Sequence, residues 1–488
     1  MSPRPALDTV AVIGGSVAGL LAAAAVAPHA ARVVVLDRDP LPAGPTGRPS
    51  TPQARHSHGL LASGRASIER LLPGFTDRVV ADGGIGSGDL GRSGRWWIGG
   101  GLIVDCDLGV RGLSASRPEF EHVIRTLVRD RPTVEILGGT DVLGLRGDAA
   151  RVTGVEVRGP DGRDRVITAD LVVDASGRAG RAARWLPRLG ARPPVEERIT
   201  VGVRYATVHV VARDDDLAGR SFLVAAATTA VPRGGVALRQ EDGSWTITLF
   251  SYLDEPVPVD PDGLIGFARS LVTPDLATLL TDRPLRHPAW GYRFPDCRRR
   301  RFVAPPAGWV AIGDAVCSVD PTFGQGMSIA ALQAVALRTA LDRTGSVDGY
   351  PAAAERIADQ AWQLVAGAVG ALPGVVAPPA RPGRAWIGRY VRRVQRVARH
   401  DPTVAAALIR VTALLDPPPA LLAPTIVARV LRPGAAGRSQ PAASEHRPDD
   451  PAVGPQRRAV DRRRPGAGDE RDDGGDLVRV DQPGQQRG

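Results

Sequence analysis

Apolar runs and glycine-rich turns alternate along the first forty residues. Residues 9–13 (TVAVI) are apolar and mostly β-branched, which predicts a buried strand of a parallel sheet. The glycine-rich stretch GGSVAG follows at 14–19, and residues 20–27 are nearly all Ala, Leu and Val, which predicts a helix buried against that sheet. Residues 32–36 (RVVVL) predict a second strand that ends at Asp37. This order is a βαβ unit with a glycine-rich turn before its helix.

Other periodicities divide the rest of the chain. Residues 199–211 and 221–252 alternate apolar and polar positions around PRGG and EDGS turns, which predicts antiparallel strands. Residues 151–169 predict a hairpin around GPDG, and residues 262–281 predict one helix. Residues 350–432 predict helices separated by prolines, which we expect to cap a substrate tunnel. The alternative is that these helices dip into a membrane surface, because Arg392, Arg393, Arg396 and Arg399 are among them.

The C-terminal segment differs in composition from what precedes it. Residues 434–488 hold no aromatic residue and show no apolar period, which predicts a disordered tail. The alternative is a shifted reading frame that replaces the true C-terminus.

The net charge of +10 carries little information about partners. All 62 basic residues are Arg and Asn is absent, which points to a GC-rich gene rather than to selection for positive charge. No basic block is interleaved with aromatic residues as a nucleic-acid stacking platform requires. We therefore expect no nucleic-acid partner.

The cysteines and the apolar runs bear on the compartment. Cys106, Cys297 and Cys317 form no CxxC pair, so neither a disulfide framework nor a zinc site is indicated. The N-terminus lacks the order of a signal peptide, and no apolar run reaches the roughly 18 residues that span a bilayer. We expect a cytoplasmic protein that does not associate with membranes.

The glycine-rich turn has the chemistry of a dinucleotide site. Gly14 permits a tight turn, Gly19 lets the helix pack closely on the strand, and the N–H groups at the helix start favour a pyrophosphate. Asp37 is placed to accept hydrogen bonds from a ribose. Ser16 stands where the motif has its middle glycine. The residues expected here are Gly14, Gly15, Ser16, Ala18, Gly19, Asp37 and Arg38. The alternative is a plain strand–helix turn without a ligand.

A second motif lies about 300 residues downstream. Residues 308–333 (GWVAIGDAVCSVDPTFGQGMSIAALQ) predict a strand at 309–312, a glycine loop and an apolar helix from about Met327. This segment resembles the second FAD motif of the flavoprotein monooxygenases related to para-hydroxybenzoate hydroxylase. In that family the Asp of the GD pair binds the ribityl chain, and the loop and helix start lie beside the isoalloxazine ring. The resemblance assigns to FAD the residues Gly313, Asp314, Pro321, Gly324, Gln325, Gly326 and Met327.

Two further segments are similar to the same family. Residues 170–181 (DLVVDASGRAGR) look like its DG segment, with Asp174 and Arg181 at the acidic and basic ends, although Ala175 replaces the inner glycine. The alternative is a strand end that closes the flavin domain. Arg117 opens a predicted helix (SRPEFEHVIRTLV), where the family often has an Arg that touches FAD. The alternative for Arg117 is a solvated charge.

A closer resemblance covers residues 9–432. Together with the motifs above, residues 53–61 (QARHSHGLL) are similar to a subgroup of bacterial FAD-dependent oxidoreductases that includes the epoxidases of polyether biosynthesis. His56 and His58 would share one face if this segment were a strand. We expect flavin or substrate contact, or structural hydrogen bonding, and no metal site. The flavin-side catalytic candidates are His56 and Pro321, with no catalytic residue assigned. Candidate pocket residues are Tyr205, Phe222, Trp245 and Phe250, and the alternative for each is a place in the core.

The expected fold class is α/β. A Rossmann-type FAD/NAD(P)-binding domain carries an inserted antiparallel-sheet substrate domain and a C-terminal helical region. The FAD-binding domain is expected from residues 1–90, 116–182 and 301–345, the substrate domain from 91–115 and 183–300, the helical cap from 346–433, and the disordered tail from 434–488.

The resemblances imply a FAD-dependent monooxygenase. It would insert one atom of O2 into a small organic substrate, such as a secondary metabolite, by epoxidation or hydroxylation through a C4a-hydroperoxyflavin. NAD(P)H would supply the electrons, directly or through a separate flavin reductase. The alternatives are a FAD-dependent reductase or dehydrogenase acting on a prenyl or polyketide-type substrate, and a non-catalytic flavin-binding protein. A halogenase is disfavoured, since that class carries a WxWxIP-type segment and a catalytic Lys, and this chain has no Lys.

Overall fold

A five-stranded parallel sheet forms the centre of the nucleotide-binding half of the protein. The computed structural model describes residues 6–377 and 384–432, so the predicted tail at 434–488 lies outside the described residues. The strand order is β17-β11-β1-β2-β7. The strands are β1 (Leu7–Ile13), β2 (Ala30–Leu36), β7 (Val134–Leu137), β11 (Leu171–Asp174) and β17 (Trp309–Ala311). The βαβ unit predicted at the N-terminus is confirmed, because β1 and β2 are parallel neighbours.

Alternate side chains of this sheet enter two different cores. Val10, Val12 and Val33 belong to a core that also contains the helices on that face. Those helices are α1 (Val17–Val26), α4 (Arg117–Arg129) and α8 (Gly326–Thr344). Ala11 and Val34 point the other way, into a core shared with an antiparallel three-stranded sheet. That sheet contains β8 (Asp141–Gly147), β9 (Val152–Arg158) and β10 (Asp164–Thr168), so the hairpin predicted at 151–169 is confirmed.

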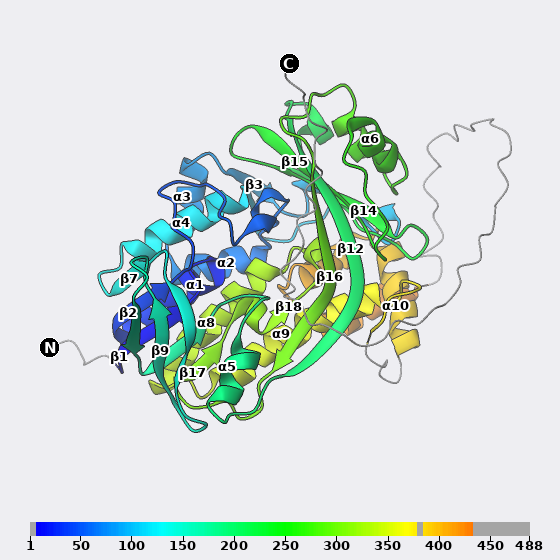
Figure 1. The fold of residues 1–488 in the computed structure, drawn as a ribbon. Helices are drawn as coiled ribbons and strands as arrows, with labels where there is room; N and C mark the ends of the chain where they lie inside the picture. Colours follow the sequence, from blue (N-terminus) through cyan, green and yellow to red (C-terminus); the bar gives the residue numbers. More distant parts are fainter. Residues whose placement is uncertain (1–5, 378–383, 433–488) are drawn as a thin grey trace, which may run out of the picture.

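The second large sheet has eight strands in the order β18-β16-β12-β15-β14-β13-β4-β5. Its long strands β12 (Val195–Val211) and β16 (Trp290–Arg301) run side by side down the molecule in Figure 1. The others are β4 (Gly94–Ile98), β5 (Gly101–Leu102), β13 (Phe222–Ala225), β14 (Arg233–Arg239), β15 (Ser244–Ser251) and β18 (Cys317–Ser318). Because β18 follows β17 after a short turn, the chain passes directly from the parallel sheet into the antiparallel one.

The single helix predicted over 262–281 is wrong. The segment forms two helices, α6 (Pro261–Arg269) and α7 (Asp275–Leu280). Pro274 is the N-cap residue of α7, and a proline disfavours helical geometry at the residue before it, so the break falls here. Both helices pack on one face of the eight-stranded sheet, and they do not cover its other face.

The C-terminal region is helical, as its proline-punctuated pattern predicts. The helices are α9 (Tyr350–Val369), α10 (Arg384–Val397), α11 (Pro402–Thr412) and α12 (Pro424–Leu431). Tyr390, Val394, Val404 and Leu408 form the core between α10 and α11. Among the described residues, no helix is long and apolar enough to cross a membrane.

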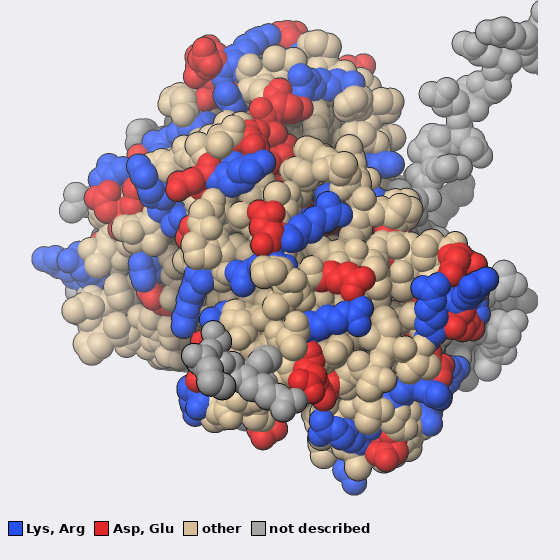
Figure 2. Space-filling model, turned by 90° about the vertical axis from the view of Figure 1, so that its left-hand side faces the viewer, with Lys and Arg blue, Asp and Glu red and all other residues tan. Residues whose placement is uncertain are grey.

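Basic and acidic side chains lie interspersed on the face of the molecule drawn in Figure 2. Ion pairs bring opposite charges together at the surface, as between Arg158 and Asp164, whose Nε and Oδ1 atoms are 2.7 Å apart. Some of the arginines at the surface are therefore paired with acidic side chains.

We expect Gly19→Ala to destabilise the protein severely, because a Cβ at this position would lie 1.7 Å from the carbonyl oxygen of Gly14. Neither atom can yield without moving the backbone, so the free energy of unfolding should fall by about 3 kcal/mol or more in a urea titration. Gly266→Ala in α6 is the matched control, since a Cβ there meets nothing within 4 Å. That variant should be unchanged or more stable by about 0.5–1 kcal/mol. Equal effects at the two positions would contradict the packing argument.

Candidate functional site

Most residues predicted to bind the cofactor line one cavity of about 2290 Å³ between the two large sheets. The predicted residues that line it are Gly14, Ser16, Ala18, Asp37, Arg38, His56, Arg117, Gly313, Asp314, Pro321, Gly324, Gln325, Gly326 and Met327. Gly15 and Gly19 do not line it and act through packing and the backbone. Segments separated by more than 300 residues in the sequence therefore converge on one space.

The glycine turn presents the start of α1 to the cavity. Gly14 has φ +104°, and a Cβ there would lie 2.5 Å from the carbonyl oxygen of Ala175. The N–H of Gly15 donates to Asp37 Oδ2 at 2.7 Å, so Asp37 fixes the turn as well as facing the cavity. Ser16 is the N-cap residue of α1 but its side chain makes no capping hydrogen bond. The first N–H groups of the helix are thus left for another acceptor.

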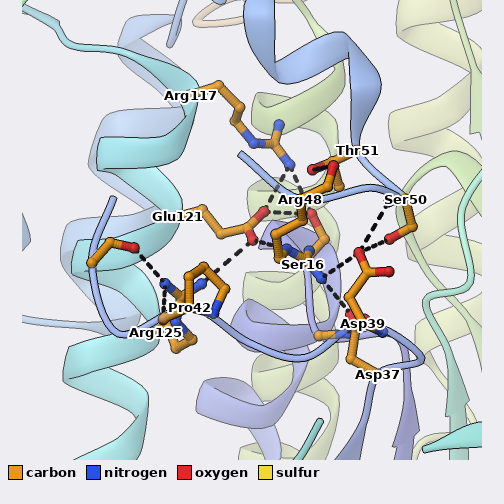
Figure 3. A network of polar contacts seen from close by, with 12 residues as sticks. Ser16, Asp37, Asp39, Pro42, Arg48, Ser50, Thr51, Arg117, Glu121 and Arg125 are labelled. Atoms are coloured by element: carbon orange, nitrogen blue, oxygen red, sulfur yellow. Dashed lines mark hydrogen bonds and ion pairs between the residues drawn. The ribbon is translucent and has the colours of Figure 1, made fainter. Parts of the chain in front are cut away.

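Ser16 is bound into a buried polar network with α4 and the loop after β2 (Figure 3). Its hydroxyl donates to Glu121 Oε2 at 2.7 Å and accepts from Arg117 Nη2 at 2.9 Å. Glu121 Oε1 accepts from Arg48 Nε at 2.8 Å, and Arg48 Nη1 lies 3.0 Å from Asp37 Oδ2. The serine in place of the middle glycine is therefore the point where the turn joins a chain of charged residues.

Within the described part of the chain, two donors of this network are left without a partner, although its charges are balanced. Burial alone would raise the pKa of Glu121, yet the neighbouring Arg117 and Arg48 hold that pKa below its usual range. Among the described residues, Arg48 Nη2 and Arg117 Nε are buried without a hydrogen-bond partner. Both side chains line the cavity beside the start of α1, so these donors and the helix dipole fit the diphosphate of FAD.

Sequence reasoning identified Arg117 but missed Arg48 and Glu121. Glu121 lies one helical turn after Arg117, and that spacing was the available signal. Arg48 lies in an irregular loop whose sequence (GRPS) shows no motif, so only its position in space reveals its role.

The turn after β17 presents Asp314 to the same cavity. Gly313 has φ +66°, and its N–H donates to Gln333 Oε1 of α8 at 2.7 Å, which fixes the turn. Burial raises the pKa of Asp314, opposed by Arg178, Arg117 and Arg300. Within residues 6–377 and 384–432, no group donates a hydrogen bond to its carboxylate. A partly buried acceptor without a donor, facing the cavity, fits a polyhydroxylated chain such as the ribityl group of FAD.

The loop that contains Pro321 places the N-terminus of α8 at the cavity. Asp320 is fully buried, accepts from the N–H of Thr322 at 2.9 Å, and receives the hydroxyl of Tyr252 at 2.8 Å. Gly324 has φ +63°, and α8 begins at Gly326 without a side-chain cap. This uncapped end of a 19-residue helix offers N–H donors and a positive dipole, which suit the charge of a reduced flavin.

The DG-like segment has a structural and a cavity-facing part. The Asp174 side chain is fully buried, accepts from the N–H of Ser176 at 3.0 Å, and does not line the cavity. This placement favours the strand-end interpretation for Asp174. Arg181 lines the cavity, and so does Arg178, which sequence reasoning missed. Arg178 lies over the ring of Phe294, 4.7 Å from its centroid, and pairs with Asp296.

His56 and His58 do not lie on a strand, so the condition under which they would share one face is not met. Residues Pro52–Arg55 form a 3₁₀ turn (η2), and the following segment is irregular, with His58 Nδ1 2.9 Å from the carbonyl oxygen of His56. His56 packs against Tyr205 and Tyr292, at 4.7 and 5.5 Å between ring centroids. Burial lowers the pKa of His56 to about 3 and that of His58 to about 4, so both are neutral at pH 7.

The remaining wall of the cavity is aromatic and apolar. Of the predicted pocket residues, Tyr205, Phe222 and Phe250 line the cavity. Trp245 does not, because it lies on the opposite face of the sheet, fully buried in the core with α6 and α7. Helices α9, α10 and α11 and the 3₁₀ turn η6 (Pro418–Leu422) also contribute lining residues, among them Trp362, Tyr390, Leu408 and Leu421. These helices lie at the cavity, as expected for a cap.

Comparisons with known proteins agree with this arrangement. Residues 9–191 match the family model described as FAD dependent oxidoreductase. The chain is 36% identical to Protein Rv3254 of Mycobacterium tuberculosis over 71% of this chain and 76% of that protein. It is 27% identical to a kynurenine 3-monooxygenase of Salinispora tropica over the same shares. Its fold is similar to that of the flavin-dependent brominase Bmp2, with a TM-score of 0.59, 16% identity, and coverage of 83% of this chain and 92% of the brominase.

We expect Arg48→Met to destabilise the protein, because it leaves Asp37 and Glu121 buried without their shared cation. The free energy of unfolding should fall by about 3–5 kcal/mol in a urea titration. Arg32→Met is the matched control. This variant breaks an ion pair with Glu135, in which the Arg32 side chain is 54% exposed and the Glu135 side chain 46%. The loss of unfolding free energy should therefore stay below about 1 kcal/mol. A loss at Arg48 as small as that at Arg32 would contradict the network argument.

Stability should fall as the pH is lowered from 7 to 5, with His56 as one cause. Its pKa is lowered from 6.5 to about 3 by burial, so only the unfolded chain takes up a proton there in this range. That difference should cost the FAD-loaded protein about 2 kcal/mol of unfolding free energy, measured in urea at both pH values. His56→Gln should remove this part of the pH dependence. The same substitution at the exposed His400 serves as the control, and an unchanged dependence in His56→Gln would refute the assignment.

Proposed function

Because the chain belongs to the FAD-dependent oxidoreductase family, we propose that it is a monooxygenase that uses FAD, NAD(P)H and O2 to oxygenate a small organic substrate. The observation that carries this proposal is the shared cavity. The glycine turn, Asp314 and the start of α8 open into the same space as the aromatic wall of the eight-stranded sheet. A cofactor held by the first group of residues would face a substrate held by the second.

The nucleotide end of FAD would lie at the start of α1. Arg117 and Arg48, with their unpaired donors, would bind the diphosphate together with the first N–H groups of the helix. Asp37 would accept from the ribose, although its Oδ2 already receives the N–H of Gly15. Ser16 holds Glu121 and Arg117 in place, so the network keeps both arginines aimed at the anion.

The flavin end would lie at the start of α8. Asp314 would accept from the ribityl hydroxyls, and the N–H groups at Gly326 and Met327 would face the pyrimidine side of the ring. The Oε1 atom of Gln325 is buried without a partner among the described residues and is available to an N–H of the cofactor. Bound FAD supplies the redox chemistry and the reaction with O2.

The protein's own contribution beside the ring is to orient the substrate and to exclude water. Tyr205, Phe250 and Tyr292 make this part of the wall aromatic, and helices from the C-terminal region close it from another side. Exclusion of water from the site strengthens polar interactions and prevents side reactions of a reactive oxygen species. The same wall accommodates an alkene for epoxidation or an aromatic ring for hydroxylation.

Two observations bear on the choice among the flavoenzyme classes. One relative that aligns with 71% of the chain is named as a kynurenine 3-monooxygenase. A halogenase of the kind that uses a catalytic Lys is disfavoured by the absence of Lys from the chain, although the brominase shares the fold. A single parallel nucleotide-binding sheet is present in the described part of the chain, so NAD(P)H would bind transiently or a separate flavin reductase would supply the electrons.

The test is the reaction of the reduced protein with O2. FAD-loaded protein, reduced with dithionite under anaerobic conditions, is mixed with oxygenated buffer in a stopped-flow spectrophotometer. We expect a transient absorbance that belongs to neither reduced nor oxidised flavin, with release of hydrogen peroxide when no substrate is present. Addition of an accepted substrate should lower the peroxide yield and place one atom of ¹⁸O from ¹⁸O2 in the product. L-kynurenine is the first candidate, because the Salinispora relative is named for it.

Free FAD under the same conditions is the control for uncatalysed reoxidation. A single-phase return to oxidised flavin, with and without candidate substrates, would contradict the monooxygenase and favour a reductase or dehydrogenase. Anaerobic mixing of the oxidised protein with NADH and with NADPH separates direct reduction from a need for a partner reductase.

A further inference from the structure

A chain of hydroxyl groups lies behind His56, in the wall of the cavity formed by the eight-stranded sheet. His56 Nδ1 is 2.8 Å from Thr207 Oγ1 on β12, and Thr207 Oγ1 is 2.7 Å from Thr248 Oγ1 on β15. Thr248 Oγ1 donates to Ser57 Oγ at 2.9 Å, and Ser57 Oγ donates to the carbonyl oxygen of Thr246 at 3.3 Å. Thr207 is fully buried, whereas Thr248 and Ser57 also line the cavity.

The direction of the chain follows from its last member. A carbonyl oxygen can only accept, so the one hydroxyl proton of Ser57 points to Thr246. Thr248 then uses its proton toward Ser57, and Thr207 must donate to Thr248. Thr207 has no second proton, so toward His56 it can only accept. Nδ1 of His56 therefore carries the ring proton, and Nε2 carries a lone pair.

The Nε2 atom is the part of the ring that remains for a ligand. His56 lines the cavity, and no hydrogen bond to Nε2 occurs among the described residues. The ring is held by edge contacts with Tyr205 and Tyr292, and burial keeps the imidazole neutral by lowering its pKa to about 3. A neutral imidazole fixed in this tautomer presents a hydrogen-bond acceptor at Nε2.

Two phenol groups line the cavity beside this acceptor. Tyr205 and Tyr292 pack on the same imidazole, with 5.2 Å between their own ring centroids. In the part of the chain that the structure describes, neither hydroxyl has a hydrogen-bond partner, and burial raises both pKa values, so both hydroxyls keep their protons. The wall thus combines one fixed acceptor with two donors in an otherwise apolar surface.

We propose that His56 Nε2 accepts a hydrogen bond from a hydroxyl group of the substrate, so that the substrate class is a phenol or alcohol attached to an apolar skeleton. A hydroxyl group both donates, to His56, and accepts, from a tyrosine of the wall. The Thr207–Thr248–Ser57 chain acts through His56, and its members are positioning residues. The inference rests on the proposed function in that the ligand of this wall is the substrate.

The tautomer is measured directly by nitrogen NMR. FAD-loaded protein labelled with [¹⁵N]histidine is observed at pH 7, and the signals lost in His56→Gln assign the ring. We expect a protonated Nδ1 and an unprotonated Nε2. Thr207→Val should move the equilibrium toward the Nε2–H form, while Thr168→Val, on an exposed position of β10, should change nothing. An Nε2–H tautomer or a charged ring in the unmodified protein would overturn the inference.

The preference for a hydroxyl is measured with a matched pair of probes. The affinities of 2-naphthol and 2-methoxynaphthalene are compared by titration calorimetry with the FAD-loaded protein. We expect 2-naphthol to bind about tenfold more tightly, as one hydrogen bond permits, and the difference to disappear in His56→Phe. Equal affinities, no binding of 2-naphthol, or a preference that survives in His56→Phe would each refute the site. These measurements need neither O2 nor turnover, so a protein that fails the oxygen test can still pass this one.

Discussion

Helix α1 reaches the end of β1 only because positions 14 and 19 carry no Cβ. A side chain at Gly19 would collide with the carbonyl oxygen of Gly14, and one at Gly14 would collide with that of Ala175. The contact brings the helix start together with the carboxyl ends of β1 and β11, at the edge of the parallel sheet where its strands end. The cavity begins at this edge, so the placement of the remaining site residues depends on this approach of two backbones.

A buried region with several charged side chains lies beside this closely packed turn. Arg48 and Arg117 are held there by ion pairs with Glu121 and Asp37. Burying such groups is unfavourable unless each finds a partner, and the network provides one for most of their atoms. The two arginines whose donors are left over, Arg48 and Arg117, also line the cavity, which links the stability of the fold to the binding of an anion.

The second sheet supplies a different chemistry to the same cavity. One of its faces packs on α6 and α7 and is closed to ligands, while the other presents tyrosines, phenylalanines and threonine hydroxyls. Strand β18 joins it to the parallel sheet directly after Asp314. The cofactor region and the substrate region are therefore neighbours by chain connectivity as well as by packing.

The local elements of this protein were predictable from its sequence where they rest on short-range patterns. The βαβ unit, the hairpin at 151–169, the helix that begins at Arg117 and the proline-separated C-terminal helices follow from apolar period, turn residues and capping, which act within a few residues. The prediction of one helix at 262–281 was wrong because Pro274 interrupts an apolar period that otherwise continues.

Contacts between distant segments were decided only by the tertiary structure. Arg48 lies in a loop with no motif, and its partners Asp37 and Glu121 are 11 and 73 positions away. Trp245 and Phe250 both belong to β15, yet Trp245 enters a closed core and Phe250 faces the cavity, because their odd spacing puts them on opposite faces. The alternation along the strand showed that two faces exist. Which face meets the cavity depends on what packs against the sheet, and no local pattern contains that information.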